Sequence, residues 1–323
     1  MAYVEQWTAL FENNAISGLI LSRDSNLSIY NITADRNIMI DLKSLNKRVL
    51  ATTCRSLLGR RNFVRFSRFL WLQARLDAAN DFYNNGESSV QDALIEYQRN
   101  RGFGDVFDVG ANIGNWSACL LEKYANSMPG RLFMFEPSPG SRAVIEQNLE
   151  AQLQDDDVIL EAIALTNESK TAIFHIVGST AGTNSLQNIS NDKQVEEIEV
   201  ECRTIDDFIA ENDIAHLTFV KVDTEGNDYN VIEGATQMMR ERKVDFIQFE
   251  YNYRWVAFRY FLKDVFELVE PLGYSVGKLT SEGIEEYDAW HFELETYREG
   301  NYLIYRRSNR LPMKHFKWWN ADS

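Results

Sequence analysis

The fold of this chain is decided by the stretch Asp105-Val-Phe-Asp-Val-Gly-Ala-Asn-Ile-Gly-Asn-Trp-Ser117. Its first five residues have the β-branched and aromatic content of a buried parallel strand. Gly110 and Gly114 then allow a tight turn and a close approach of the backbone to a ligand, because glycine has no Cβ. Asn112, between them, is a residue type that tolerates left-handed dihedrals. The stretch therefore predicts a strand, a tight turn and a helix over Asn115 to about Tyr124.

The sequence of the same turn indicates which of two kinds of nucleotide cofactor it suits. A dinucleotide fingerprint reads G-x-G-x-x-G and holds a pyrophosphate at the helix N-terminus. Here Gly110 and Gly114 are four residues apart, and Asp108 stands two residues before the first of them. A carboxylate would repel a pyrophosphate, whereas it can accept hydrogen bonds from an ammonium group. The turn thus favours S-adenosylmethionine, which carries an ammonium and a sulfonium, over NAD. A strand-turn-helix with packing glycines alone is the structural alternative.

A second acid fits the same interpretation. Arg131-Leu-Phe-Met-Phe-Glu136 is predicted to be a buried strand that ends in a carboxylate, 22 residues beyond Gly114. In open α/β sheets, an acid at the end of the second strand typically holds ribose hydroxyls. Glu136 is therefore a candidate ribose ligand, for NAD as well as for S-adenosylmethionine.

Several elements together resemble a known family. They are Asp108–Gly114, Phe135–Pro139, Thr204–Phe208 and Lys221-Val-Asp-Thr-Glu-Gly226, and they look like those of the FkbM-type methyltransferases. The similarity runs in order over about residues 83–307, and Lys-x-Asp-x-Glu-Gly is its most specific part. The resemblance implies dependence on S-adenosylmethionine and O-methylation of hydroxyl groups on natural products or sugars.

The length of 323 residues suits one large α/β domain with an extension. We predict a doubly wound, mostly parallel, Rossmann-like seven-stranded sheet in residues 100–323 and a mainly helical N-terminal extension in residues 1–99. The expected strands are 105–110, 131–136, 158–164, 217–223, 244–250, 274–280 and 301–306. A β-rich insertion is expected between the third and fourth, with strands near 171–177 and 196–202.

Two of these strands also end in carboxylates. Asp223 ends the fourth strand and Glu250 the fifth, with Asn252 on the same side two residues later. Adjacent strands lie about 4.8 Å apart, so these side chains should converge beside the cofactor. Their charges need compensation, from Lys221, from Arg254, from a proton on one acid or from a divalent cation.

The nature of that compensation leaves two chemical roles open. By analogy with catechol O-methyltransferase, Asp223, Glu250 and Asn252 are tentative ligands of Mg²⁺ or Mn²⁺, which prefer such oxygens. Without a metal, Asp223 or Glu250 would act as general base or orient the acceptor hydroxyl.

Three further residues are candidates on position alone. His291 lies in an aromatic connection before the last strand and is a candidate catalytic base. Glu161, after the third strand, is a candidate for the adenine amino group. Glu87, after Asn84-Asn-Gly86, is a candidate for the cofactor's amino group. For each, a structural or surface role is the alternative.

The stretch from Leu42 to Leu76 contains no acid and nine of the 33 basic residues, so that the rest of the chain holds 24 basic and 48 acidic residues. We expect it to form helices, and three roles stay open. It would dock on this chain's acidic domain or on a twin subunit in a homodimer, bind an anionic or carrier-linked acceptor, or contact nucleic acid or anionic lipid. The net charge of −15 disfavours binding to nucleic acid.

No apolar run approaches the roughly 18–20 residues that a membrane span requires, so none is predicted. Three scattered cysteines without a C-x-x-C pair indicate a reducing compartment, and the cytoplasm is the expected location. Two alternatives to a methyltransferase stay open: a non-catalytic scaffold that keeps the fold, and an NAD-dependent oxidoreductase. Retention of four strand-end carboxylates argues against the first, and the glycine spacing argues against the second.

Overall fold

The structure is a computed structural model that describes residues 42–318 apart from 78–80, 103, 126–127, 179, 181, 183 and 188–194. The side chains of residues 42–46 are also outside the description. Residues 1–41 of the predicted N-terminal extension lie outside the described residues. The chain forms two compact units, Met1–Phe63 and Val64–Ser323.

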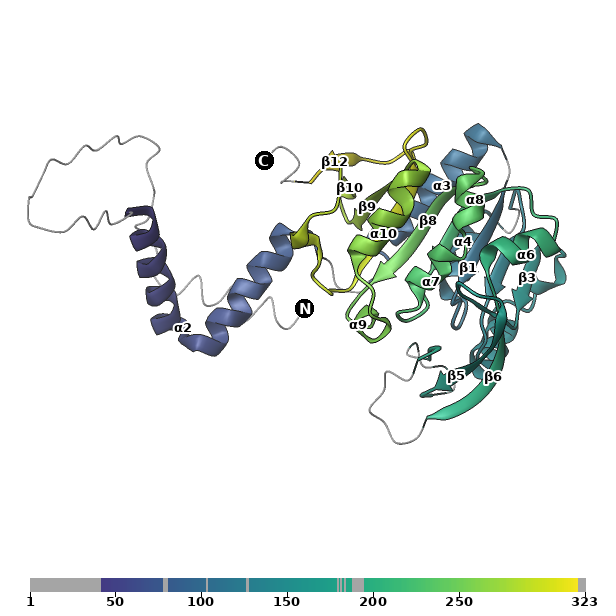
Figure 1. The fold of residues 1–323 in the computed structure, drawn as a ribbon, viewed down its shortest axis with the longest axis horizontal. Helices are drawn as coiled ribbons and strands as arrows, with labels where there is room; N and C mark the ends of the chain where they lie inside the picture. Colours follow the sequence, from purple (N-terminus) through teal and green to yellow (C-terminus); the bar gives the residue numbers. More distant parts are fainter. Residues whose placement is uncertain are drawn as a thin grey trace, which may run out of the picture. The chain divides into compact units, whose positions relative to one another are not determined.

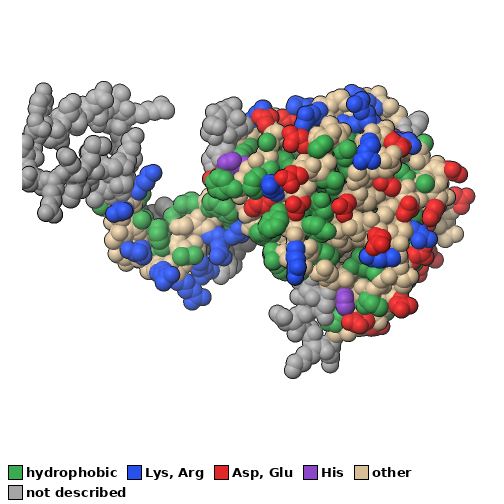
Figure 2. All heavy atoms as spheres, in the orientation of Figure 1, with side chains coloured by type: hydrophobic (Ala, Val, Ile, Leu, Met, Phe, Trp, Pro, Cys, Tyr) green, Lys and Arg blue, Asp and Glu red, His purple; other side chains and the backbone are tan. Residues whose placement is uncertain are grey.

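The basic stretch is helical, as its sequence predicts. Helix α2 (Leu42–Ala74) begins in the first unit and ends in the second, and Gly59, at φ 71° and ψ 155°, interrupts its helical dihedrals. Figure 2 shows lysine and arginine side chains along it, next to exposed apolar ones such as Leu57 and Phe69. None of the helices in the described part of the chain has the length and apolarity that crossing a bilayer requires.

The second unit is built on a nine-stranded sheet with the strand order β12-β10-β9-β11-β8-β7-β1-β2-β3 (Figure 1). Strands β3, β2, β1, β7 and β8 are mutually parallel, and β11 runs antiparallel to both of its neighbours, β8 and β9. The strands are β1 (Asp105–Val109), β2 (Leu132–Phe135), β3 (Val158–Glu161), β7 (Leu217–Val222), β8 (Val244–Tyr251), β9 (Tyr274–Thr280), β10 (Gly283–Glu286), β11 (Gly300–Arg306) and β12 (His315–Lys317). The predicted seven-stranded, mostly parallel sheet is confirmed, and β10 and β12 extend one edge.

Helices cover both faces of the sheet because successive strand residues point to opposite sides. Val106 belongs to one hydrophobic cluster and Phe107 to the other. The cluster of Val106 includes residues of α3 (Glu87–Arg101), α4 (Asn115–Lys123) and α5 (Pro139–Asn148). The cluster of Phe107 includes residues of α6 (Ile205–Glu211), α7 (Asp228–Glu233), α8 (Thr236–Arg240), α9 (Trp255–Phe258) and α10 (Leu262–Val269). This two-sided cover is the doubly wound arrangement that the sequence predicts.

Helix α3 lies inside the predicted N-terminal extension, yet its apolar face packs on the sheet. Val90, Leu94 and Tyr97 are buried in the same cluster as Val106 and Phe246. The helix therefore belongs to the core of the second unit. The division of the chain near residue 99 stays a prediction.

The β-rich insertion forms a separate three-stranded sheet in the order β4-β6-β5. Its strands are β4 (Ala164–Leu165), β5 (Lys170–Ile176) and β6 (Glu196–Arg203), with β5 and β6 antiparallel. The expected strand at 158–164 is divided, because β3 ends at Glu161 and Ala164 joins this second sheet. Short 3₁₀ turns complete the unit at Gln152–Gln154, Glu270–Leu272 and Phe292–Leu294.

Candidate active site

A pocket that is open to solvent lies at the carboxyl ends of β1, β2 and β7. The strand order reverses between β1 and β7, which is where open α/β sheets bind their ligands. The turn after β1, the acid after β2 and residues 223–225 and 227 after β7 form its walls. Ile163–Leu165, Phe174 and residues 182, 184 and 186 close it from the insertion.

The turn after β1 has the left-handed dihedrals that its residue types allow. Gly110, Asn112 and Gly114 have φ values of 79°, 51° and 81°. A Cβ on Gly110 would lie 2.0 Å from the carbonyl oxygen of Asp223, so only glycine fits where the ends of β1 and β7 meet. The amide of Gly110 donates to the carbonyl oxygen of Phe135 at 2.9 Å, which ties the turn to β2.

Glu136 follows β2 and lines the pocket as a buried carboxylate. Its Oε2 accepts a hydrogen bond from the amide of Asn112 at 2.8 Å, and its Oε1 accepts one from the amide of Ser138 at 2.8 Å. Burial raises the pKa of Glu136 to about 7, although the two amides oppose the shift. Each oxygen keeps a free lone pair, so the carboxylate can still accept from two hydroxyl groups of a ligand.

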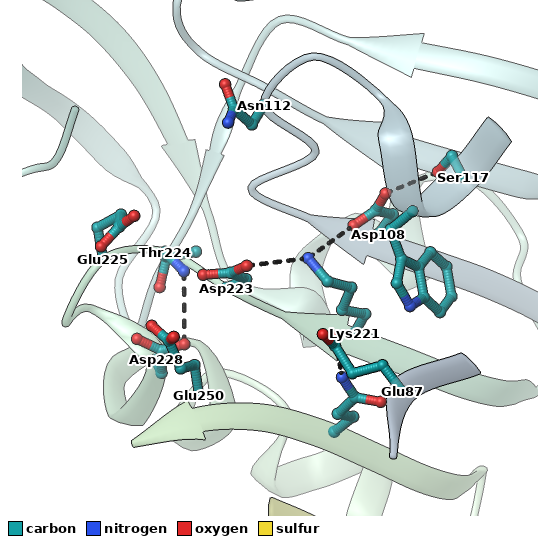
Figure 3. A network of polar contacts seen from close by, with 12 residues as sticks. Glu87, Asp108, Asn112, Ser117, Lys221, Asp223, Thr224, Glu225, Asp228 and Glu250 are labelled. Atoms are coloured by element: carbon teal, nitrogen blue, oxygen red, sulfur yellow. Dashed lines mark hydrogen bonds and ion pairs between the residues drawn. The ribbon is translucent and has the colours of Figure 1, made fainter. Parts of the chain in front are cut away.

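Asp108 lies behind the turn, not among the residues that line the pocket (Figure 3). It is fully buried, accepts a hydrogen bond from the Ser117 hydroxyl at 2.7 Å and lies opposite Lys221 in the register of β1 and β7. The Lys221 ammonium is 3.5 Å from Oδ1 of Asp108 and 3.2 Å from Oδ2 of Asp223. The ammonium group of Lys221 therefore pairs with two acids, Asp108 on β1 and Asp223 just after β7.

The acids determine the charge state of Lys221. Burial alone lowers the pKa of this lysine, but Asp223, Asp108 and Glu87 together raise it above its ordinary value. Glu87, at the start of α3, accepts hydrogen bonds from the side-chain amides of Asn85 at 2.7 Å and Gln248 at 2.8 Å. Burial raises the pKa of Glu87, while Lys221 opposes the shift. Glu87 thus borders Lys221 and is not among the residues that line the pocket.

A second group of acids lies on the other side of Asp223 (Figure 3). Glu225 lines the pocket and pairs through Oε2 with Arg254. Burial and Asp223 raise the pKa of Glu225 to about 8, against the effect of Arg254. Asp228 accepts from the amides of Gly226 at 3.1 Å and Thr224 at 3.4 Å, and burial followed by Asp223 raises its pKa to about 7.

Glu250 is buried at the end of β8 and does not line the pocket. Its burial and the nearby carboxylates of Asp223 and Asp228 raise its pKa well above the ordinary value. The side-chain amide of Asn252 donates to its Oε2. Burial and the nearby carboxylates thus favour protonation of Glu250, whereas the hydrogen bond from Asn252 opposes it.

The residues expected to hold a metal ion do not fit that role. Among the described residues, no group of three or more His, Cys, Asp or Glu side chains is arranged to hold one. Asn252 has a single side-chain oxygen, and this accepts a hydrogen bond from the amide of Arg254 at 2.8 Å. Asp223 already has the ammonium of Lys221 as its positive partner. The geometry does not support Mg²⁺ or Mn²⁺ binding by Asp223, Glu250 and Asn252.

Two other predicted residues are not among those that line the pocket. The Nδ1 of His291 accepts from the amide of Glu293 at 3.3 Å, which caps a 3₁₀ turn, and its ring packs 5.1 Å from that of Trp318. Glu161 is half-buried at the end of β3, and burial with the nearby Glu201 raises its pKa. Neither is among the residues that line the pocket.

Conversely, the sequence prediction omitted residues that do line the pocket. Glu225 was not a candidate, although it stands in the Lys-x-Asp-x-Glu-Gly element beside a glycine. That glycine was the available signal, since it indicates a turn that redirects the chain. Phe174 comes from the insertion, and no local pattern connects it with the carboxyl ends of the main strands.

Comparisons with known proteins bear on the same region. A family model described as the methyltransferase FkbM domain matches residues 108–276. No curated protein sequence matches the chain.

Solved structures with a similar fold include three methyltransferases. A methyltransferase FkbM from Methylobacillus flagellatus KT is 16% identical at a TM-score of 0.39, with 62% of this chain and 43% of that one covered. A precorrin-6y C5,15-methyltransferase from Geobacter metallireducens GS-15 is 14% identical at a TM-score of 0.34, with 68% of this chain and 88% of that one covered. An rRNA methylase from Streptococcus thermophilus is 10% identical at a TM-score of 0.37, with 71% of this chain and 99% of that one covered. The chain thus spans less than half the length of the first protein, and similarities this low carry no inference about activity or substrate.

Proposed function

Because the chain belongs to the FkbM methyltransferase family, we propose that it transfers the methyl group of S-adenosylmethionine to a hydroxyl group of a small molecule. The observation that carries the proposal is the pocket at the β1–β7 reversal, with a glycine turn on one side and carboxylates on the others. Such a pocket suits a cofactor with a ribose and two cationic groups. It does not suit a pyrophosphate, which Glu136, Asp223 and Glu225 would repel.

The cofactor's parts can be assigned along the strand order. Glu136 would accept hydrogen bonds from the ribose hydroxyls. Ile163–Leu165 and Phe174, beyond β2, would contact the adenine, in place of Glu161. The turn from Gly110 to Gly114 would lie against the methionine part. Asp108 and Glu87 would act indirectly, because Asp108 pairs with Lys221, Glu87 interacts with it electrostatically, and neither acid lines the pocket.

The chemistry divides between cofactor and protein. The bound cofactor supplies a methyl group on a positively charged sulfur, which keeps the electron pair of the breaking C–S bond while the acceptor oxygen forms the new bond to carbon. Of the predicted catalytic residues, Asp223 lines the pocket, and we propose that its carboxylate acts as the general base that takes the proton of the acceptor hydroxyl. Lys221 holds Asp223 in place at 3.2 Å. Glu250 and His291 would influence the reaction only from outside the pocket.

The acceptor is proposed to be a natural product or a sugar. Asp223 and Glu225 form one wall of the pocket, so the reacting end of the acceptor should be neutral. An anionic or carrier-linked part would have to lie outside this pocket. We propose two alternative roles for the arginines of α2, which are to bind an anionic partner or to join two subunits. Cys54, Cys119 and Cys202 are free thiols, and we propose the cytoplasm as the compartment.

The first test is isothermal titration of the full chain with S-adenosylmethionine, with NAD in a parallel titration. We expect micromolar binding of the first and none of the second. Glu136→Ala should weaken binding by about ten- to hundredfold, because it removes two charge-assisted hydrogen bonds. Glu146→Ala removes an exposed carboxylate of α5 and should leave the affinity unchanged.

The outcomes separate the competing functions. Folded protein that binds no S-adenosylmethionine would contradict the methyltransferase proposal and leave the scaffold. Binding of NAD alone would favour the oxidoreductase.

A further inference from the structure

The strand order fixes the direction in which a cofactor would lie. The pocket is lined in sequence by the segment after β3, by Glu136 after β2, by the turn after β1 and by Asp223–Glu225 after β7. With the ribose at Glu136 and the adenine toward β3, the opposite end of the molecule must point toward β7. The sulfonium, which follows the ribose directly, then lies between the Gly110 turn and residues 223–225. This step rests on the proposed function.

Glu225 is held in this position by a rare backbone conformation. Its φ of 58° lies in the left-handed region, which few residues with a bulky side chain adopt and which costs about 1–3 kcal/mol. The following Gly226, at φ 104°, has no room for a side chain, because a Cβ there would lie 3.0 Å from Phe258. The turn directs the Glu225 side chain toward the pocket, and Oε1 of Glu225 would lie 3.5 Å from a Cβ on Gly182.

The carboxylate is only partly neutralised. Oε2 of Glu225 pairs with Arg254, and the two side chains are 18% and 17% exposed, so this pair is largely screened from water. The surrounding charges are Asp223 and Lys221 from β7, Asp228 from α7, Glu250 from β8 and Glu299 before β11. Acids outnumber bases in this set, so a cationic group in this part of the pocket would have more carboxyl groups than basic groups near it.

We propose that Glu225 is the cofactor-binding residue that faces the sulfonium, and that the Glu225–Arg254 pair distinguishes the cationic methyl donor from its neutral thioether product. A carboxylate next to a sulfonium is attracted to it, and the attraction ends when methyl transfer makes the sulfur neutral. The donor and the product share their adenosine, ammonium and carboxylate groups. They differ in the methyl group and in the charge at sulfur, and replacing Glu225 by a neutral residue removes the effect of that charge on the carboxylate.

Protonation gives the proposal a second consequence. With its pKa raised to about 8, Glu225 is mainly protonated in the empty pocket near neutral pH. A sulfonium beside it favours the charged carboxylate, so binding of the donor should release a proton from Glu225, whereas binding of the product should not.

The test compares S-adenosylmethionine with S-adenosylhomocysteine by isothermal titration of the full chain at about pH 7.5, in buffers of different ionisation enthalpy. The wild type should bind the donor more tightly and release more protons with it. In Glu225→Gln, the ratio of the two affinities should fall by about tenfold, and the difference in proton release should disappear. Glu199→Gln, on the exposed side of β6, removes a carboxylate far from the pocket and should behave as the wild type.

A second variant, at Arg254, should change the ratio of the affinities for donor and product in the opposite direction. Arg254→Gln leaves the carboxylate of Glu225 without its counter-charge and should increase the preference for the donor. Thermal unfolding of each variant would establish that it is folded.

The possible failures are distinguishable. If the wild type binds neither compound, the proposed function itself is wrong. If both compounds bind, and Glu225→Gln keeps the wild-type affinity ratio and proton release, the methyltransferase proposal stands and the role of Glu225 is overturned.

Discussion

Lys221 shows how one residue makes a carboxylate-rich pocket possible. Its ammonium group lies within 3.5 Å of Asp108 and 3.2 Å of Asp223, from a position that is almost fully buried. An isolated buried carboxylate would become protonated or destabilise the fold. Lys221, Arg254, a proton and a divalent cation were the sources of compensation that the sequence left open, and Lys221 pairs with both Asp108 and Asp223.

Lys221→Met tests this role at the residue scale. The variant keeps the length of the side chain but leaves Asp108 buried without its cation, which should lower the free energy of unfolding by about 3–5 kcal/mol. Urea denaturation measures the change. Lys263→Met removes an exposed lysine whose partner is Glu267, and it should leave the stability nearly unchanged. Equal stabilities of the two variants would contradict the role assigned to Lys221.

At the scale of elements, the sequence predicts most where local pattern and burial agree. Strands β1, β2, β7 and β8 are apolar runs bounded by turns, and the helix after Gly114 begins at Asn115 as expected. Strands β10 and β12 were missed because they have four and three residues, too few for a periodic signal. Thr204 caps α6 by accepting a hydrogen bond from the amide of Asp207 at 2.9 Å, as its residue type suggests.

The candidate site was less predictable than the strands. Strand ends place Glu136 and Asp223 at the pocket, since the carboxyl ends of parallel strands share one edge of the sheet. Glu250 is buried and does not line the pocket, and the ring of His291 packs against that of Trp318. No local pattern in the sequence predicts either outcome.

The turn after β1 gives a prediction for an element. Gly110→Ala places a Cβ 2.0 Å from the carbonyl oxygen of Asp223, so the ends of β1 and β7 must separate. We expect a clear loss of stability and of affinity for S-adenosylmethionine. Gly273→Ala has a similar φ of 84° but meets no atom within 4 Å, and it should cost only the backbone strain of about 1–2 kcal/mol. Similar losses in both variants would mean that the dihedral, and not the contact with β7, requires glycine at residue 110.

At the scale of the whole molecule, the acids around the pocket link stability to pH. Burial raises the pKa of Glu136 and Asp228 to about 7 and that of Glu225 to about 8, from ordinary values near 4. The folded chain thus holds protons that the unfolded chain has lost. The stabilising effect of these bound protons is complete at a pH below the ordinary pKa of the acids, and it disappears as the pH rises through their raised pKa values.

These acids should therefore contribute to the free energy of unfolding of the empty protein, and their contribution should fall as the pH rises from about 4.5 to 8. Asp228→Asn removes one titrating group and should make the decline shallower, as measured by urea denaturation across that range. Asp156→Asn changes an exposed acid and should reproduce the wild-type slope. An unchanged slope in Asp228→Asn would show that Asp228 keeps its ordinary pKa in the folded chain.

The pairing of β1 also affects the order in which the protein can fold during synthesis. Val106 pairs with Leu132 on one side and with Phe219 on the other, so its second neighbour is translated more than eighty residues after its first. Until β7 emerges from the ribosome, Asp108 has no ammonium partner, and closing a core around it is unfavourable. The nascent chain is thus kept from completing the first half of the sheet too early, and the segment that supplies Lys221 also completes the pocket.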